Sequence, residues 1–179
     1  MNSKRSSIEA GLRIAILALF FGSGVCALVY EVAWMRMFRL VMGNTVFTAA
    51  TVLTVFMGGL GLGAYVSGRL THRCHRPLFT YALIEGAVGV YALLLLAFFG
   101  LAEPVYGWVY SWASDSVVLL GVGRFFVSSA LLIFPTTLLG ATLPLLCRFV
   151  SSSRKHLGRD VGRLYGLNTL GAATGAAIT

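Results

Sequence analysis

The sequence predicts an all-α integral membrane protein with about five membrane-spanning helices. Hydrophobic residues make up 58% of the 179 residues and charged residues only 11%. In soluble domains roughly a quarter of all residues are charged. Long apolar runs alternate with short basic loops. No run shows the ten-residue alternation of a membrane strand, so helices must satisfy the backbone within lipid. The composition therefore excludes an ordinary soluble domain.

Five apolar runs approach the roughly 20 residues that a spanning helix needs. They predict one helical transmembrane domain over residues 1–179, with spans at about 12–34, 46–67, 78–101, 119–147 and 164–179. The first run is too long for a signal peptide and lacks a convincing cleavage site, so we expect it to be retained. The last run has no flanking charge to end it. We therefore expect an incomplete last helix and a fragment or truncation of something longer.

The basic residues indicate the topology. The net charge is +8, which in a soluble protein would suggest nucleic acid. Here eleven of the 14 basic residues fall on one side if the spans alternate, namely Lys4, Arg5, Arg13, Arg69, Arg73, Arg76, Arg148, Arg154, Lys155, Arg159 and Arg163. The pattern predicts a multi-pass protein of the bacterial inner membrane with a cytoplasmic N-terminus, in contact with lipid and not with nucleic acid.

Two segments between and within the spans are unusual. Residues 104–116 carry Tyr106, Trp108, Tyr110 and Trp112, and such side chains settle at headgroup level. This pattern favours an outer interfacial segment over a lid on an outward cavity. In the fourth run, Pro135 removes a backbone hydrogen bond, and we expect a kink there, with Thr136 and Thr137 satisfying the freed carbonyl.

Glycine pairs and a cluster of metal-type residues need separate interpretation. Gly59 and Gly63, like Gly171 and Gly175, are four residues apart and predict faces where helix backbones approach closely. Residues 72–75 read His-Arg-Cys-His, but a metal site needs about four ligands. We expect a basic cytoplasmic loop there, and no metal or cofactor in this chain.

Ionisable residues within the spans are the candidate functional residues, because charge in a bilayer normally has a partner or a task. Glu31 and Arg124 are expected in the outer half and could form a structural pair. Glu85 is expected in the inner half, near Asn168 or Tyr165. Such contacts could merely tie helices together. Alternatively, the two carboxylates could line a cavity for a cationic ligand.

In the cationic-ligand alternative, Glu85 is the stronger candidate, because Arg124 would neutralise the outer site. Tyr81 lies one turn before Glu85 on the same helix face. Together with Asn168 it could orient an ammonium group. Glu31 completes the set of candidate ligand-binding residues.

The assembled motifs resemble the membrane portion of the bacterial transmembrane spermidine-synthase-like family, which is similar to polyamine aminopropyltransferases. The resemblance covers nearly the whole chain and rests, in order, on Ser23-Gly24, Tyr30 to Arg36, Gly43-Asn44-Thr45, Phe56 to Gly63, Tyr81 with Glu85, Pro135 to Pro144, and Gly162 to Gly171.

The resemblance implies a soluble Rossmann-like transferase domain after the helical region. The expected activity is transfer of an aminopropyl group to a polyamine precursor. No such domain is expected within these 179 residues, so no catalytic residue is assigned. Two hypotheses follow. The chain is a membrane module that anchors, delivers to or exports from a polyamine transferase, with that domain or other membrane subunits as partners. Alternatively, it is an autonomous small transporter-like or assembly subunit without catalytic activity.

Overall fold

The computed structural model describes residues 2–42, 46–113, 117–150 and 157–179. These residues form α1 (Asn2–Met42), α2 (Val46–Leu70), the short 3-10 helix η1 (Thr71–Arg73), α3 (Pro77–Ala113), α4 (Val117–Val150) and α5 (Leu157–Ile178). No strand occurs in these ranges. The prediction of an all-helical chain is therefore confirmed.

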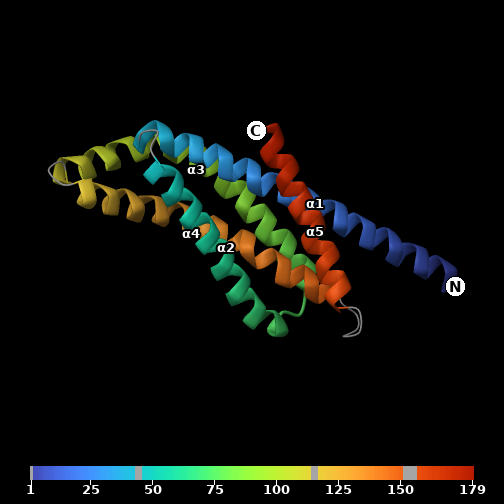
Figure 1. Cartoon of the computed structure of the whole chain (residues 1–179). Coiled ribbons are helices and arrows are strands. Elements are labelled where there is room, and N and C mark those ends of the chain that lie inside the picture. The colour runs from blue at the N-terminus through green and yellow to red at the C-terminus, as the bar shows by residue number, and fades with distance from the viewer. Residues whose placement is uncertain (1, 43–45, 114–116, 151–156) are drawn as a thin grey trace.

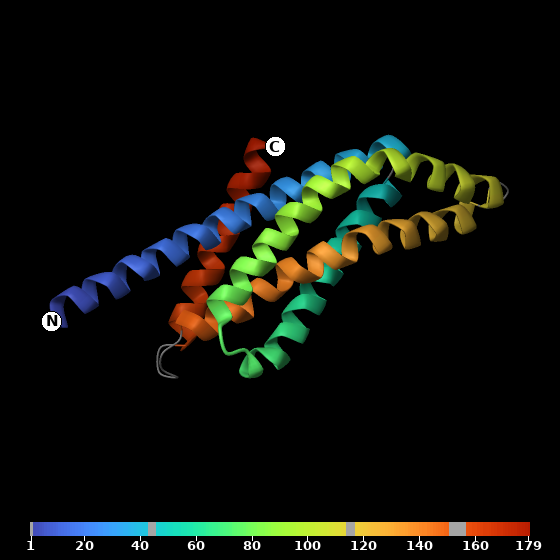
Figure 2. The same cartoon turned by 180° about the vertical axis from the view of Figure 1, so that it is seen from behind.

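The helices pack as two close pairs, and α3 contacts both of them. α2 packs along α4, and α5 packs along α1, while α3 contacts both α4 and α1. α5 crosses α1 steeply, and the N-terminal part of α1 extends beyond the other helices (Figures 1 and 2). The outer ends of α3 and α4 project together on the opposite side of the bundle (Figures 1 and 2).

Four described segments are long and apolar enough to cross a membrane: Gly11–Leu40, Val46–Arg73, Pro77–Leu95 and Val118–Val150. α5 is not among them. Its first two turns carry Arg159, Asp160 and Arg163. Many large apolar side chains point outward, including Phe47 at 77% exposure and Leu93 at 70%. An outer surface this apolar requires lipid or protein around it.

The predicted interfacial segment is not a separate element. α3 continues without a break through residues 104–113. At 1.5 Å per residue its 37 residues make a helix of about 55 Å, which exceeds a hydrocarbon core of about 30 Å. Trp108 and Tyr110 are exposed on its outer turns. The aromatic residues are therefore carried outward by an extension of the helix, and the expected end of the third span at about residue 101 stays a prediction.

Glycines allow both helix pairs to approach closely. A Cβ at Gly59 would collide with the side chain of Thr136, and one at Gly63 with the carbonyl of Thr137. In the other pair, a Cβ at Gly171 or Gly175 would collide with backbone atoms of α1. Small residues favour helix association in lipid, where van der Waals packing replaces the hydrophobic effect as the driving force.

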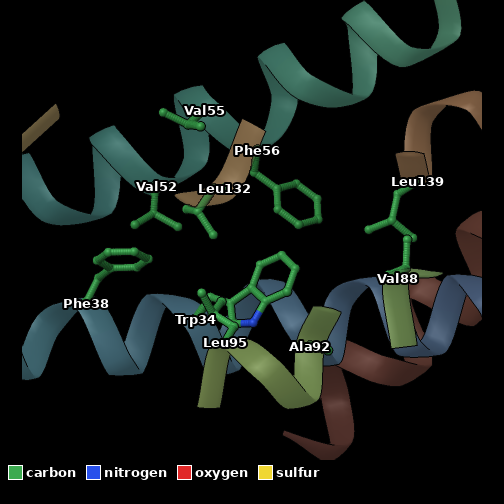
Figure 3. Close-up of a cluster of buried hydrophobic side chains, with 10 residues drawn as sticks. All are labelled: Trp34, Phe38, Val52, Val55, Phe56, Val88, Ala92, Leu95, Leu132 and Leu139. Atoms are coloured by element: carbon green, nitrogen blue, oxygen red, sulfur yellow. The ribbon is translucent and has the colours of Figure 1, made fainter. Parts of the chain in front are cut away.

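A cluster of buried apolar side chains fills the space between α1, α2, α3 and α4 (Figure 3). Its members are Trp34, Phe38, Val52, Val55, Phe56, Val88, Ala92, Leu95, Leu132 and Leu139. A second cluster joins α1, α3, α4 and α5. It lies nearer the end of the bundle where the basic residues gather, which we call the basic end. The second cluster contains Ile16, Phe20, Tyr81, Leu146 and Leu164.

The carbonyl that Pro135 leaves without a helical donor belongs to Leu131, four residues earlier. It accepts a hydrogen bond of 2.7 Å from the Tyr91 hydroxyl of α3. Thr136 and Thr137 instead donate to the carbonyls of Leu132 and Ile133. The expectation that these threonines satisfy the freed carbonyl is wrong, because that carbonyl accepts its hydrogen bond from Tyr91 of the neighbouring helix. α4 remains one continuous helix across Pro135.

Basic side chains tie one end of the bundle together. Arg148 of α4 donates to the carbonyl of Thr71 in η1, and Arg13 of α1 donates to the carbonyl of Val150 at 3.5 Å. The start of α1, the α2–α3 connection and the end of α4 therefore lie at the same end. This is the grouping that the alternation of spans requires.

We expect Gly63→Leu to disrupt folding far more than Gly61→Leu. Gly63 faces backbone atoms of α4, whereas nothing lies within 4 Å of a Cβ at Gly61. Forcing the helices apart should cost at least about 1–3 kcal/mol. Folded yield and thermal unfolding in detergent, compared between the two variants, check this. Equal yields and midpoints would contradict it.

We expect Tyr91→Phe to lower stability by about 1–3 kcal/mol, because the half-buried Leu131 carbonyl would lose its donor. Tyr65→Phe is the matched control, since Tyr65 is 56% exposed and its ring faces the Arg69 guanidinium. Thermal unfolding in detergent measures both. A Tyr91→Phe midpoint equal to that of the parent would show that the hydrogen bond does not stabilise the fold.

Candidate functional site

Glu85 is a carboxylate on the inward face of α3. Tyr81, Val88, Ala92 and Leu95 are buried, and together with Glu85 they recur at spacings of three and four residues, which places them on one helix face. Glu85 itself is half-buried. Its position is eight residues after Pro77, about 12 Å along the helix from the basic end.

The Glu85 carboxylate is held by hydroxyl groups from two helices. Ser23 Oγ of α1, on a side chain that is 8% exposed, donates to Glu85 Oε1 over 2.6 Å. The Tyr81 hydroxyl also lies within hydrogen-bonding reach of both Glu85 and Ser23. The Tyr81 ring packs edge-on against Phe20, with 6.3 Å between the ring centroids. This packing fixes the position of the hydroxyl.

In the part of the chain that the structure describes, neither intramembrane glutamate has a basic partner. Among the described residues, the side chains that hydrogen-bond Glu85 are the hydroxyls of Ser23 and Tyr81. Glu31 of α1 is 6% exposed, and no described charge acts on it. A carboxylate in an apolar environment is costly unless a counter-charge or hydrogen bonds compensate it. The Glu85 site can therefore accept a cation, with hydroxyl oxygens beside the carboxylate.

The predicted contact of Glu85 with Asn168 or Tyr165 does not form. Asn168 of α5 donates through Nδ2 to the carbonyl of Phe20 at 3.1 Å, and Tyr165 is 61% exposed. Asn168 instead contacts α1 at Gly24, where a Cβ would collide with its backbone oxygen. Glu85 and Asn168 thus reach the same stretch of α1 from different helices.

The predicted pair of Glu31 and Arg124 stays a prediction. Arg124 belongs to α4, but its side chain lies outside the described residues. The four packing glycines lie in the two helix interfaces described above. Across the described ranges no group of three or more His, Cys, Asp or Glu comes together. Cys74 instead contacts the Thr80 hydroxyl at 3.3 Å.

Sequence reasoning did not single out Ser23 as a partner of Glu85. The available signal was that Ser23 is the only serine or threonine between Ile14 and Val29. A hydroxyl in a long apolar run commonly bonds across helices. The sequence did not show which helix would lie opposite.

Two curated proteins are similar to this chain over nearly all of its length. Polyamine aminopropyltransferase 1 of Streptomyces coelicolor is 26% identical over 171 residues, which cover 92% of this chain. Polyamine aminopropyltransferase 2 of the same organism is 30% identical over 168 residues, covering 91%. The chain spans only 28% of the length of each relative.

No protein-family model matches the chain, and no solved structure matches it. The similarity to the two transferases nevertheless bears out the resemblance drawn from the motifs. The match covers only part of each polyamine aminopropyltransferase, and the matched chain consists of apolar helices. Both findings are consistent with the membrane domain of a spermidine-synthase-like protein.

Proposed function

We propose that this chain is the membrane module of a polyamine aminopropyltransferase-like protein and that it holds a cationic amine for delivery or export. The observation that carries the proposal is the Glu85 site, where a half-buried carboxylate receives hydroxyl groups from Ser23 and Tyr81. The basic partner that would make it a structural ion pair is absent from the described residues. An ammonium group would supply the missing charge.

The chemistry of the ligand supports the assignment. A polyamine is strongly hydrated, so a low-dielectric site must replace its water with fixed negative charge and oxygen acceptors. Glu85 provides the charge, and the hydroxyls of Ser23 and Tyr81 provide acceptors beside it. The similar proteins are named as polyamine aminopropyltransferases, which makes an amine the natural candidate. In this proposal the module anchors the transferase to the inner membrane and serves it with the ligand.

A second candidate is an autonomous transporter-like or assembly subunit. The Glu85 site is built from α1 and α3 of this chain. Binding an amine there therefore requires no transferase domain. Comparing amine binding by this chain with binding by the same chain joined to a transferase domain distinguishes the two. Unchanged affinity and no coupling to transfer activity would favour the second candidate.

We expect Glu85→Gln to weaken putrescine and spermidine binding by at least about tenfold while leaving the fold intact, because a charge-assisted interaction is lost. The amide oxygen can still accept from Ser23. Calorimetry on the purified protein measures binding, and thermal unfolding measures the fold. Glu31→Gln is the comparison. It should lower the unfolding midpoint, since Arg124 would lose its proposed counter-charge, but leave binding by the folded fraction unchanged. If the parent binds neither amine, or Glu85→Gln binds both equally well, the proposal fails.

The orientation is tested by thiol labelling. In a background in which Cys26, Cys74 and Cys147 are replaced, we expect Gly107→Cys in intact cells to react with a membrane-impermeant reagent. Arg73→Cys should react only after permeabilisation, because the basic end is proposed to face the cytoplasm. Labelling of Arg73→Cys from outside would reverse the proposed topology.

A further inference from the structure

We propose that the hollow between α2, α3 and α4 at the basic end binds one anionic phospholipid, with an acyl chain in the hollow and the phosphate on nearby arginines. The hollow has a volume of about 280 Å³. It lies where the chain turns from α2 through η1 into α3, beside the last turns of α4 (Figures 1 and 2). In the described residues, α2 and α3 both pack on α4 but scarcely contact each other, which leaves space between them.

The hollow lies just inside the expected membrane surface. One segment that is long and apolar enough to span ends at Arg73, and the next begins at Pro77. The turn between them therefore belongs at headgroup level. Gly63 and Thr71 both line the hollow, and eight residues of helix rise about 12 Å. The hollow thus extends from the headgroups into the depth of the acyl chains.

The walls of the hollow suit an acyl chain. Apolar side chains from all three helices line it, namely Val66, Leu70, Ile84, Leu138 and Leu145. Val66 is 40% exposed and Leu70 is 52% exposed, so the hollow can be reached from the lipid side. An apolar cavity of about 150 Å³ takes up benzene, which has six carbons, so this hollow has room for a chain segment of roughly ten carbons.

The hydroxyl groups in the lining are already used within the protein. Each donates to a backbone carbonyl: Ser67 to Ala141 at 2.9 Å, Thr80 to Arg76 at 3.2 Å, Thr137 to Ile133 at 2.6 Å, and Thr71 to Ser67. A polar ligand needs a few well-placed hydrogen-bonding groups in its pocket. Because these donors are occupied, the lining favours an apolar occupant over a polar one.

The charge at the headgroup end of the hollow complements a phosphate. Arg73 and Arg76 are exposed beside the turn. Arg148 donates to the carbonyl of Thr71, a lining residue, and a guanidinium group has further N–H donors to offer. The sequence of α2, η1, α3 as far as Ile84, and α4 contains no Asp or Glu. Basic pockets between helices at the cytoplasmic surface are suited to anionic lipid headgroups.

Native mass spectrometry of the purified chain, titrated with dioleoyl phosphatidylglycerol or dioleoyl phosphatidylcholine, tests the charge requirement. We expect one phosphatidylglycerol to bind at least about tenfold more tightly than phosphatidylcholine. Replacing Arg73 and Arg76 together by Gln should weaken its binding by at least about tenfold, because each arginine near the headgroups adds attraction. Arg39→Gln is the matched control, since Arg39 is exposed in the last turn of α1. Equal affinity for the two lipids, or an unaffected double variant, would overturn the proposal.

A second variant tests the acyl chain position. Val66→Trp fills the hollow from an exposed position and should weaken phosphatidylglycerol binding by at least about fivefold. Leu62→Trp is its control, because Leu62 is 47% exposed on the same helix but does not line the hollow. A folded Val66→Trp variant that binds the lipid like the parent would contradict the proposed position.

Two further measurements use the parent chain and do not depend on how a variant folds. Phosphatidylglycerol with a photoreactive diazirine on an acyl chain should crosslink to the lining residues of α2, α3 or α4, and adducts confined to other surfaces would overturn the proposal. Glycerol 3-phosphate carries the phosphate without acyl chains and should not displace the lipid. Displacement by it would show a site for free phosphate instead of a phospholipid.

Discussion

The fold depends on backbone-to-backbone contact at glycines. Within lipid, burying apolar side chains gains little over leaving them in the acyl chains, so helices associate where packing is closest. α2 meets α4 through Gly59, Gly63 and Gly140, and α5 meets α1 through Gly24 and residues of its own glycine face. In either pair, a Cβ added at one of these glycines would collide with the facing helix. At the described glycines of the remaining helix, α3, a Cβ would meet nothing within 4 Å, so in this part of the chain α3 is held by side chains.

That difference explains why the candidate site lies on α3. A helix held through side chains leaves space where those side chains are missing, and Gly86 and Gly89 leave it towards α1. The same helix carries Glu85, whose hydrogen bond from Ser23 crosses to α1. α1 is thus packed tightly against α5 on one side and loosely against α3 on the other.

Several polar side chains in the bundle hydrogen-bond across helices. Tyr91 of α3 compensates the carbonyl freed by Pro135, Ser67 of α2 donates to the carbonyl of Ala141 at 2.9 Å, and Asn168 of α5 donates to α1. Each bond satisfies a group that lipid cannot satisfy. Glu85 fits this pattern only in part, because hydroxyls hydrogen-bond the carboxylate without neutralising its charge. That remainder sets it apart from the structural polar contacts.

The sequence by itself determined the class of the protein, its helical runs and the faces of its helices, because composition and a period of 3.6 residues are local properties. It placed Tyr81 with Glu85 on one face, and Gly59 with Gly63 on another. Only the tertiary structure decided what those faces meet: Ser23 and not Asn168 opposite Glu85, Thr136 at Gly59, and Tyr91 at the Leu131 carbonyl. The reason is physical. Partner choice depends on how helices distant in sequence rotate and cross, and this is settled by packing over the whole interface.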